Sequence, residues 1–467
     1  MRNVLFIALI SIALSLIAGS AAAQTAEKRI RIEMEKRKAL EQTELKILEG
    51  EDRLVIDYGG WINFRYDDYK DDDNDSSAED SLDYTYSADF RLWMKATLKP
   101  PPGAAYKNEH SLYIRLKDLH INSYPKDIND GYDHDGPHLD YGYFLFNFNP
   151  YLLEVGRRYY SVGQGIAYGN LHDGLEFRSE LEYWTLRALV SHTLRHEDNI
   201  DTSVPGWDKK SSRFFYGLEG TYLGIPNQGV YFYLLVQKDE SPEDPDDPLR
   251  DYTYDSEYLG LGSQGKITDT IHYWAEIIRQ TGESRVYATG EKRDVSAWAV
   301  DFGATYDVDA YSHPNFTIEF AYGSGDADRT SVTDTQNGNT SGDDNNFLYF
   351  GYLPTGYAFS PRLSNIYFIK AGVLLKPLEK YDLFENFTFG IDYYRYYKAE
   401  ETGGISDIDA SVNDDDLGFE IDLNISWKIL SDLSCSFEYG YFKPGSAFPD
   451  TANDDEKYLS ISTTITF

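Results

Sequence analysis

From Leu54 onward, apolar and polar side chains alternate with a period of two residues. In the first such run, Leu54, Ile56 and Tyr58 fall on one face, whereas Asp57 and Asn63 fall on the other. The alternation recurs in runs at 84–98, 230–237, 316–322, 417–428 and 459–467. Several runs reach about 10 residues, whereas strands of soluble sandwiches usually have about 5–6. A long strand with one apolar and one polar face is typical of a membrane-spanning barrel.

The number and spacing of these runs predict a large closed barrel. About 18 segments follow one another, and single-chain bacterial barrels have even strand numbers, so 18 or 16 strands fit best. A barrel of this size encloses an aqueous lumen. Tight turns such as Asn149-Pro150 alternate with long acidic loops at 67–80, 239–251, 323–346 and 407–416, as expected for periplasmic and outer rims. We therefore predict an all-β fold, a transmembrane antiparallel β-barrel over residues 54–467.

The two ends of the chain indicate its destination. Arg2, the apolar run 4–18 and the three alanines at 21–23 have the layout of a secretory signal peptide, which we assign to residues 1–23. The apolar run is shorter than the ~20 residues that a spanning helix needs. The last alternating run ends on Phe467, which resembles the signal for assembly into the outer membrane. We predict an integral protein of a Gram-negative outer membrane, in contact with its lipid.

Residues 24–53 form a charged leader of helical composition, placed in the periplasm. Two interpretations stay open for it. It is either a short solvated helix or disordered leader, or a coiled-coil or plug-like docking element, and one or two weak heptads do not decide between them.

Composition narrows the function classes. The mean hydropathy is −0.51, too polar for a helical membrane protein, and the aromatic content is 15%. A net charge of −35 argues against nucleic acid as a partner. The single cysteine, Cys435, excludes an intrachain disulfide and a cysteine-based metal site. No cofactor is expected. The acidic runs 71–73 and 244–247 could hold Ca²⁺, but they lack the EF-hand spacing, and solvated loops are the alternative interpretation.

A central stretch carries a family resemblance. It contains a Val-Gly-Arg strand end at Val155–Arg157, a Gly-Gln-Gly connection at 163–165, and Asp173-Gly174-Leu175 opening the next strand. This order resembles the alginate-export family of outer-membrane barrels. The resemblance implies an 18-stranded channel that passes an acidic polysaccharide outward through a strongly basic lumen. The sequence departs from that pattern because it has no dense run of arginines on every strand.

Alternation parity indicates which charged side chains face the lumen. Arg or Lys facing lipid at the bilayer midplane costs about 2–4 kcal/mol, so charges should point inward. Alternation cannot place both Arg157 and Arg158 inside, and the resemblance favours Arg157. The predicted pore-lining residues are Arg65, Arg91, Lys95, Arg115, Lys117, Arg157, Asp173, Arg178 and Arg187. Two interpretations stay open for them. They form either a basic path for anions, or ion pairs with inward acids such as Asp89 and Glu176 that only stabilise the barrel wall.

The sequence predicts a channel rather than an enzyme. It has nine histidines and contains neither a G-x-S-x-G elbow nor an H-E-x-x-H motif. No phosphate-binding G-x-x-x-x-G-K-[ST] motif is present, so transport would be downhill. The favoured interpretation is diffusion-type export of an anionic, alginate-like polysaccharide, received from periplasmic export proteins. The alternative is a general or anion-selective porin for small anionic solutes.

Overall fold

The computed structural model describes residues 54–70, 84–100, 108–124, 132–195, 197–201, 211–241, 254–286, 289, 291–334 and 338–467. The predicted signal peptide (1–23) and leader (24–53) lie outside the described residues. So do the two acidic runs considered for Ca²⁺, 71–73 and 244–247.

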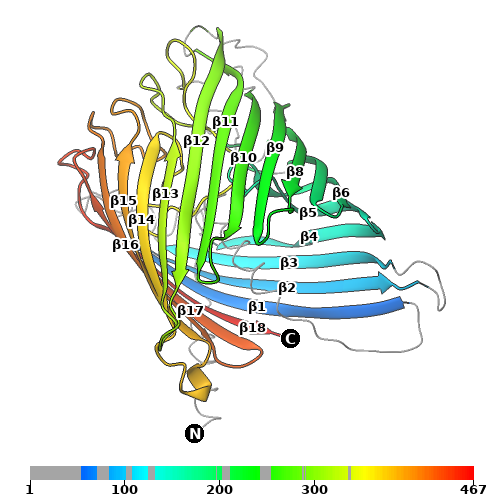
Figure 1. The fold of residues 1–467 in the computed structure, drawn as a ribbon. Coiled ribbons are helices and arrows are strands. Elements are labelled where there is room, and N and C mark those ends of the chain that lie inside the picture. Colours follow the sequence, from blue (N-terminus) through cyan, green and yellow to red (C-terminus); the bar gives the residue numbers. More distant parts are fainter. Residues whose placement is uncertain are drawn as a thin grey trace.

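Eighteen strands form one antiparallel sheet that closes on itself (Figure 1). Each strand pairs with its neighbours in sequence, and β1 also pairs with β18, with Ile62 opposite Ile465. The strands are β1 (Leu54–Lys70), β2 (Tyr84–Leu98), β3 (His110–Tyr124), β4 (Tyr132–Phe148), β5 (Tyr151–Ser161), β6 (Gly169–Glu180), β7 (Trp184–His192), β8 (Arg213–Tyr222), β9 (Gln228–Asp239), β10 (Asp255–Lys266), β11 (Ile271–Arg285), β12 (Lys292–Asp307), β13 (Asn315–Gly323), β14 (Ile366–Leu375), β15 (Phe387–Lys398), β16 (Asp416–Lys428), β17 (Leu433–Pro444) and β18 (Glu456–Thr466). The prediction of a closed antiparallel barrel with 18 strands is confirmed.

The outer wall of the barrel is apolar. Tyr58, Leu218 and Ile318, from three separate strands, are 59–60% exposed, and similar side chains follow around the circumference. The side chains at the alternate positions of the strands point inward. Among them, Asp67, Gln237 and Glu276 are buried. An exposed apolar surface of this extent suits contact with lipid rather than with water.

The barrel closes beside the C-terminus. Gly60 of β1 and Phe467, which follows β18, exchange two backbone hydrogen bonds of 2.9 and 3.0 Å. A Cβ at position 60 would lie 2.5 Å from the carbonyl oxygen of Arg91 on β2, so only glycine fits there. The seam therefore depends on a residue without a side chain.

Strand connections define two rims. The short-turn rim carries connections such as 149–150 and 429–432, and the long-loop rim carries 399–415 and 445–455. The only helical turn in the described part of the chain is a 3₁₀ turn, η2 (Asp382–Phe384), which joins β14 to β15. No helix among the described residues is long and apolar enough to cross a membrane.

The described parts of the connection between β13 and β14, residues 324–334 and 338–365, fold into the barrel and are called the inner segment below. Its apolar residues Phe347, Tyr349 and Leu363 are buried, although the sequence suggested that this region begins as a long outer loop. The physical reason lies in the composition of its second half, where a run of apolar and aromatic residues at 347–350 follows the acidic part. Burying these side chains against the inner wall removes them from water.

Candidate functional site: the barrel lumen

One cluster of charged side chains lies on the inner wall of β2–β4. Arg91 Nε lies 2.6 Å from Asp89 Oδ1, and the guanidinium groups of Arg91 and Arg115 both contact the carboxylate of Asp140. Arg115 also stacks over the ring of Tyr141, 4.0 Å from its centroid. Arg91, Arg115 and both aspartates are buried. This arrangement ties three strands together and leaves little guanidinium surface for a solute.

A second cluster surrounds Glu176 of β6. Its carboxylate oxygens lie 2.9 Å from Arg178, 3.0 Å from Arg187 and 3.5 Å from Arg158. Arg187 also contacts Glu219 of β8 at 2.9 Å. Three arginines therefore share one buried carboxylate. Glu154, which contacts Arg158, and Glu219 supply two further carboxylates, so the charges of this cluster balance.

Two further predicted bases also have carboxylate partners. Arg65 Nε lies 2.8 Å from Asp67 Oδ1, and its NH2 group donates to the Tyr458 hydroxyl at 2.7 Å. Lys117 Nζ lies 2.6 Å from Asp135 Oδ2. Lys95 differs from all the others, because its side chain is exposed and has no carboxylate partner in the described part of the chain.

The strand register places Arg157 and Asp173 on the outer wall, which differs from the prediction that they line the pore. Arg158, at the opposite parity, shares the inner face of β5 with Glu154. Arg157 and Asp173 form a two-point ion pair, with Nε–Oδ1 and NH2–Oδ2 distances of 2.9 Å. Arg157 also donates to the Leu139 carbonyl at 2.9 Å. The pair satisfies its own charges, which reduces the cost of placing an arginine on this face.

Acidic residues of the second half of the barrel anchor inward-folded backbone. The Glu420 carboxylate accepts hydrogen bonds from the amides of Tyr357 (2.6 Å), Ala358 (2.7 Å) and Phe359 (3.2 Å). Glu276 accepts the Gln164 amide at 2.8 Å and the hydroxyls of two inward tyrosines. No local pattern in the sequence indicates that Glu420 binds a loop.

Residues 162–168, which join β5 to β6, also turn into the lumen and pair with the inner segment. The Phe350 amide donates to the Ala167 carbonyl at 2.9 Å, and the Tyr352 amide donates to the Gly165 carbonyl at 3.0 Å. On the wall, the Tyr258 hydroxyl of β10 donates to the Leu348 carbonyl at 2.6 Å. The inner segment thus contacts β10 on one side and β16 on the other, and it spans the lumen between them.

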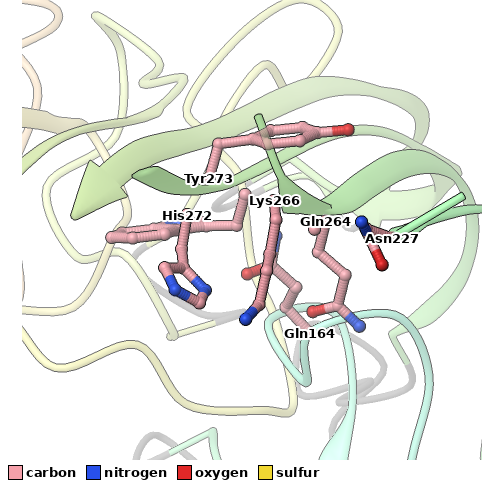
Figure 2. A pocket seen from close by; sticks show the side chains of 8 residues that line it. Gln164, Asn227, Gln264, Lys266, His272 and Tyr273 are labelled. Carbon is pink, nitrogen blue, oxygen red and sulfur yellow. The ribbon is translucent and has the colours of Figure 1, made fainter. Parts of the chain in front are cut away.

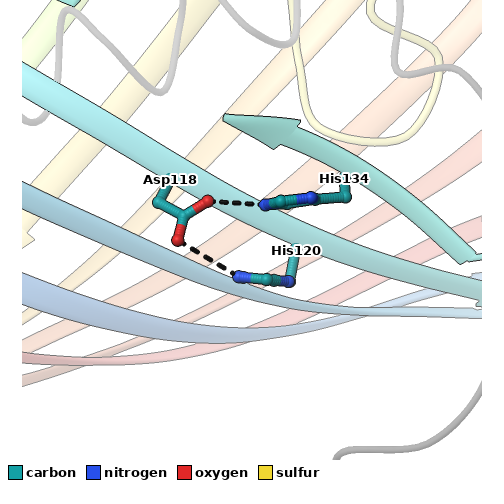
Figure 3. A group of neighbouring side chains, drawn as sticks. All are labelled: Asp118, His120 and His134. Atoms are coloured by element: carbon teal, nitrogen blue, oxygen red, sulfur yellow. Dashed lines mark hydrogen bonds and ion pairs between the residues drawn. The ribbon is translucent and has the colours of Figure 1, made fainter. Parts of the chain in front are cut away.

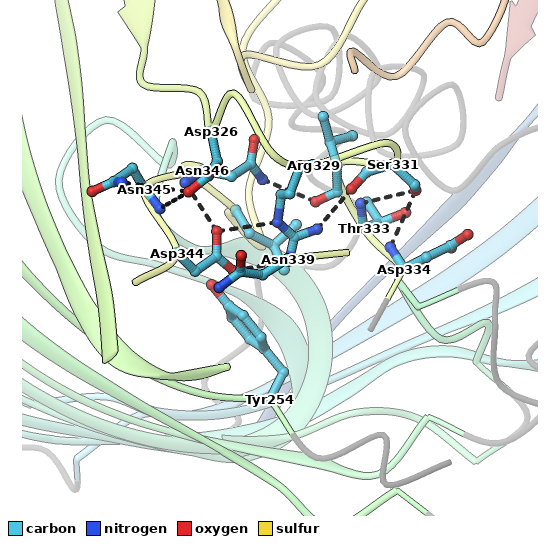
Figure 4. Close-up of polar contacts among 12 residues, drawn as sticks. Tyr254, Asp326, Arg329, Ser331, Thr333, Asp334, Asn339, Asp344, Asn345 and Asn346 are labelled. Carbon is cyan, nitrogen blue, oxygen red and sulfur yellow. Dashed lines mark hydrogen bonds and ion pairs between the residues drawn. The ribbon is translucent and has the colours of Figure 1, made fainter. Parts of the chain in front are cut away.

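A buried polar network holds the outer part of the inner segment together (Figure 4). Arg329 lies between Asp344 and the Ser331 carbonyl, to which its NH1 group donates at 2.7 Å. The Asn346 side chain donates to the Val332 carbonyl at 3.0 Å, and the Asn345 amide donates to Asp326 at 2.8 Å. These contacts join both ends of the acidic stretch, so it forms a compact body.

A polar cavity of about 530 Å³ lies near the short-turn rim (Figure 2). Lys266 and His272, from the adjoining ends of β10 and β11, point toward Gln164 of the 162–168 connection (Figure 2). The lining is Gln164, Asn227, Gln264, Gly265, Lys266, His272, Tyr273 and Trp274. Amides, a cation and an indole ring suit a hydroxylated, negatively charged solute.

Comparisons with known proteins agree with this architecture. Three crystal structures from Pseudomonas aeruginosa share the fold. They are OprD (15% identity, 91% of this chain and 99% of that chain, TM-score 0.51), OccK5 (OpdH; 11%, 88% and 98%, 0.54) and OccK8 (OprE; 13%, 88% and 98%, 0.54). No curated protein sequence matches the chain. The alginate export family model matches residues 147–462, which is more than half of the chain. The chain therefore belongs to the alginate-export family, and it is an outer-membrane β-barrel channel rather than an enzyme.

Proposed function

We propose that the channel lets an anionic, alginate-like polysaccharide diffuse outward across the outer membrane. The observation that carries this proposal is a set of three lysines, Lys95, Lys266 and Lys428, called the entrance lysines below. Each lies at or near the short-turn end of its strand, and each has an exposed side chain. Parity places all three on the lumen face, because Lys95 follows Arg91, Lys266 follows Tyr258 and Lys428 follows Asp422 by an even number of residues.

The entrance lysines differ from the arginines deeper in the lumen. None of the three has an ion-pair partner among the residues that the structure describes, whereas Arg91, Arg115 and Arg187 are bound to carboxylates. An unpaired cation at a channel mouth raises the local concentration of anions. The entrance lysines would therefore collect the carboxylates of the polymer, and the paired arginines would hold the wall.

The wall bases that are not fully buried complete the proposed path. Arg65, Lys117, Arg178 and Arg187 remain partly accessible beside their partners. A uronate carboxylate could exchange with the protein carboxylates at such sites. Each contact would then be weak, and conduction requires binding that is easily released.

The cavity beside Lys266 supports a sugar as the solute. Gln164 and Gln264 offer amide donors and acceptors, and the Trp274 ring offers an apolar face. Sugar rings present hydroxyls at their edges and C–H groups on their faces, so both kinds of contact are useful. Lys266 would then meet the carboxylate that distinguishes a uronate from a neutral sugar.

The inner segment favours a second candidate, a porin for small anionic solutes. Because this segment contacts both β10 and β16, the route around it is narrower than the barrel. A small solute needs less room than a polymer to pass the segment. The two candidates thus differ in the size of the solute that passes.

Efflux from proteoliposomes tests the proposal. Vesicles with the purified channel are loaded with oligouronates of several lengths, with neutral oligosaccharides of matched length, or with acetate. Export predicts faster efflux of oligouronates than of neutral oligomers, and a loss of this preference in the variant Lys95→Glu/Lys266→Glu/Lys428→Glu. The control is Lys292→Glu at the long-loop rim, where Lys292 is already paired with Glu283. Efflux of acetate alone would support the small-solute porin, and equal rates for acidic and neutral oligomers would contradict both.

A further inference from the structure

Two histidines and an aspartate meet on β3 and β4, away from the lumen (Figure 3). His120 and His134 are direct cross-strand partners, and Asp118 lies two residues before His120 on the same face. Asp118 Oδ1 lies 2.6 Å from His134 Nε2, and Asp118 Oδ2 lies 3.5 Å from His120 Nε2. Among the described residues, this is the one group of three potential metal ligands whose donor atoms all lie within 4.8 Å of one another.

The cluster faces outward. Leu116, at the parity of Asp118 and His120, is 45% exposed, whereas Arg115, at the opposite parity, is 5% exposed and contacts Asp140 inside the barrel. The ring of His120 also packs edge-on against Phe90, an exposed side chain of β2. The lumen and its charge clusters are therefore on the other side of the wall.

The level of the cluster along the barrel axis is also defined. Toward the short-turn rim, the outer wall beside the cluster is apolar, with Leu92, Leu116 and Leu139 exposed. Toward the long-loop rim, a band of tyrosines begins: Tyr66, Tyr84, Tyr86, Tyr124 and Tyr132. Tyrosines gather where the hydrocarbon meets the headgroups, so the cluster lies at the interface of the membrane and not at its centre.

The Nε2 atoms of both histidines face the Asp118 carboxylate (Figure 3). The Tyr132 hydroxyl lies 2.7 Å from His120 Nδ1, a contact that engages this nitrogen and leaves Nε2 directed toward Asp118. The rings of His120 and His134 stack with centroids 4.4 Å apart and an interplanar angle of 13°, so one ring must rotate about its Cβ–Cγ bond for both Nε2 atoms to reach a single ion. A hydrogen bond to the second ring nitrogen is the usual support of a metal-binding histidine.

We propose that Asp118, His120 and His134 bind one divalent transition-metal ion of the zinc class on the outer wall. Zinc takes nitrogen and carboxylate ligands at about 2.0–2.2 Å, which places tetrahedral ligand atoms about 3.3 Å apart. The observed separations, 2.6 Å from His134 Nε2 to Asp118 Oδ1 and 3.5 Å from His120 Nε2 to Asp118 Oδ2, lie on either side of that value. The fourth position faces away from the barrel and would take water. Two imidazoles exclude a preference for Ca²⁺ or Mg²⁺, which choose oxygen ligands.

The metal would also account for polar residues on this face. A carboxylate and two imidazoles beside an apolar band are costly unless they are paired, and a bound cation neutralises Asp118 and occupies both ring nitrogens. The simpler explanation is a hydrogen bond from the His134 ring to Asp118 without metal. Both explanations use the same contacts, so the test must measure the ion itself.

Zinc binding to the tag-free channel in detergent decides between them. Competition with a chromophoric chelator is expected to show one Zn²⁺ per chain, and Ca²⁺ should not displace it. The double variant His120→Ala/His134→Ala should lose this binding, and Tyr132→Phe should weaken it by about tenfold. The control is His313→Ala, at the distant β12–β13 turn, which should bind zinc like the parent protein.

The results that would overturn the proposal are equally defined. Each variant is first shown to be folded by its slower migration on a gel after heating. A folded parent protein without stoichiometric zinc, or a folded double variant that binds zinc like the parent, would show that the cluster is only an Asp–His hydrogen bond. The readout is independent of transport, so failure here leaves the proposed function untouched.

Discussion

Arg329 and Asp344 form a two-point ion pair within the inner segment, with Nε–Oδ1 and NH2–Oδ2 distances of 3.1 and 2.9 Å. Their side chains are only 2% and 0% exposed. Removing one partner of a buried pair leaves the other charge buried without a counter-charge, which typically lowers the stability by about 3–5 kcal/mol. The outer part of the inner segment is therefore rigid, and it should move as a body rather than unfold when a solute passes.

The first prediction concerns this pair. Arg329→Met keeps most of the side-chain stem but leaves Asp344 buried without a counter-charge. We expect the inner segment to detach from its packed position, with a higher single-channel conductance in planar bilayers. Lys292→Met, which breaks the exposed pair with Glu283, is the matched control and should conduct like the parent. Equal conductance of the Arg329 variant and the parent would show that the pair does not restrict the lumen.

The second prediction concerns the attachment of the inner segment to the wall. Glu420→Gln keeps the size of the side chain but removes the charge that accepts three consecutive amides. A hydrogen bond to a charged group contributes about 1.5–3 kcal/mol, so exchange at residues 357–359 should accelerate by roughly 10-fold or more. Hydrogen–deuterium exchange measures this rate. Glu400→Gln, in an exposed loop, should leave the rate unchanged.

The third prediction concerns the contact between the two inward segments. A Cβ at Gly351 would lie 1.8 Å from the Gly165 carbonyl oxygen, which is too close for any adjustment short of moving backbone. Gly351→Ala should therefore separate the inner segment from residues 162–168 and increase cleavage of both by an added protease. At Gly229 an added Cβ meets its nearest atoms at 3.6 Å, so Gly229→Ala should resist the protease like the parent. Protection of Gly351→Ala would show that the segments pack differently.

The fourth prediction separates the two kinds of basic residue. Lys95→Glu places a negative charge at an exposed site of the lumen, so the reversal potential in a salt gradient should shift toward cation preference. Asp140→Asn instead weakens the contact with both Arg91 and Arg115, and it should lower the unfolding temperature with little change in selectivity. A selectivity change of similar size in both variants would argue that the buried arginines also lie on the ion path.

The sequence was sufficient to predict the barrel, because alternation is a local property and each strand carries it. Inward placement of Arg91, Arg115 and Arg187 followed from the same rule. The rule could not decide between Arg157 and Arg158. Adjacent residues lie on opposite faces of a strand, and the sequence does not show which of these two faces the lumen. The structure settles the parity through the pairing of Glu154 with Glu176.

Other parts of the site depend on contacts between distant residues. Glu420 and the amides at 357–359 are separated by 61–63 positions, and no local pattern links them. His120 and His134 lie on two strands whose register includes irregularities, so their meeting could not be read from spacing. The aromatic run at 347–350 was the available signal that the β13–β14 connection turns inward, because long outer loops rarely carry such a run.

The last prediction concerns pH and the 399–415 connection between β15 and β16. Burial raises the pKa of Asp407 to about 6. The Asp409 amide, which donates to Asp407 at 2.8 Å, and the charge of Lys398 oppose this shift, whereas the Asp409 carboxylate adds to it. The ordinary value in an unfolded chain is about 3.9. Between pH 4 and pH 6 the folded connection therefore holds a proton that the unfolded form has lost, so its stability is highest below pH 4 and falls as the pH rises through 6.

Hydrogen exchange at residues 405–412, corrected for the intrinsic pH dependence, should accordingly be faster at pH 7 than at pH 5. Asp407→Asn imitates the protonated side chain and should abolish the difference, because nothing then titrates in this range. Asp382→Asn, in the exposed turn η2 at the other rim, should preserve it. If the parent protein showed slower corrected exchange at pH 7 than at pH 5, Asp407 would have to be stabilised as a carboxylate, and Lys398 rather than burial would control the connection.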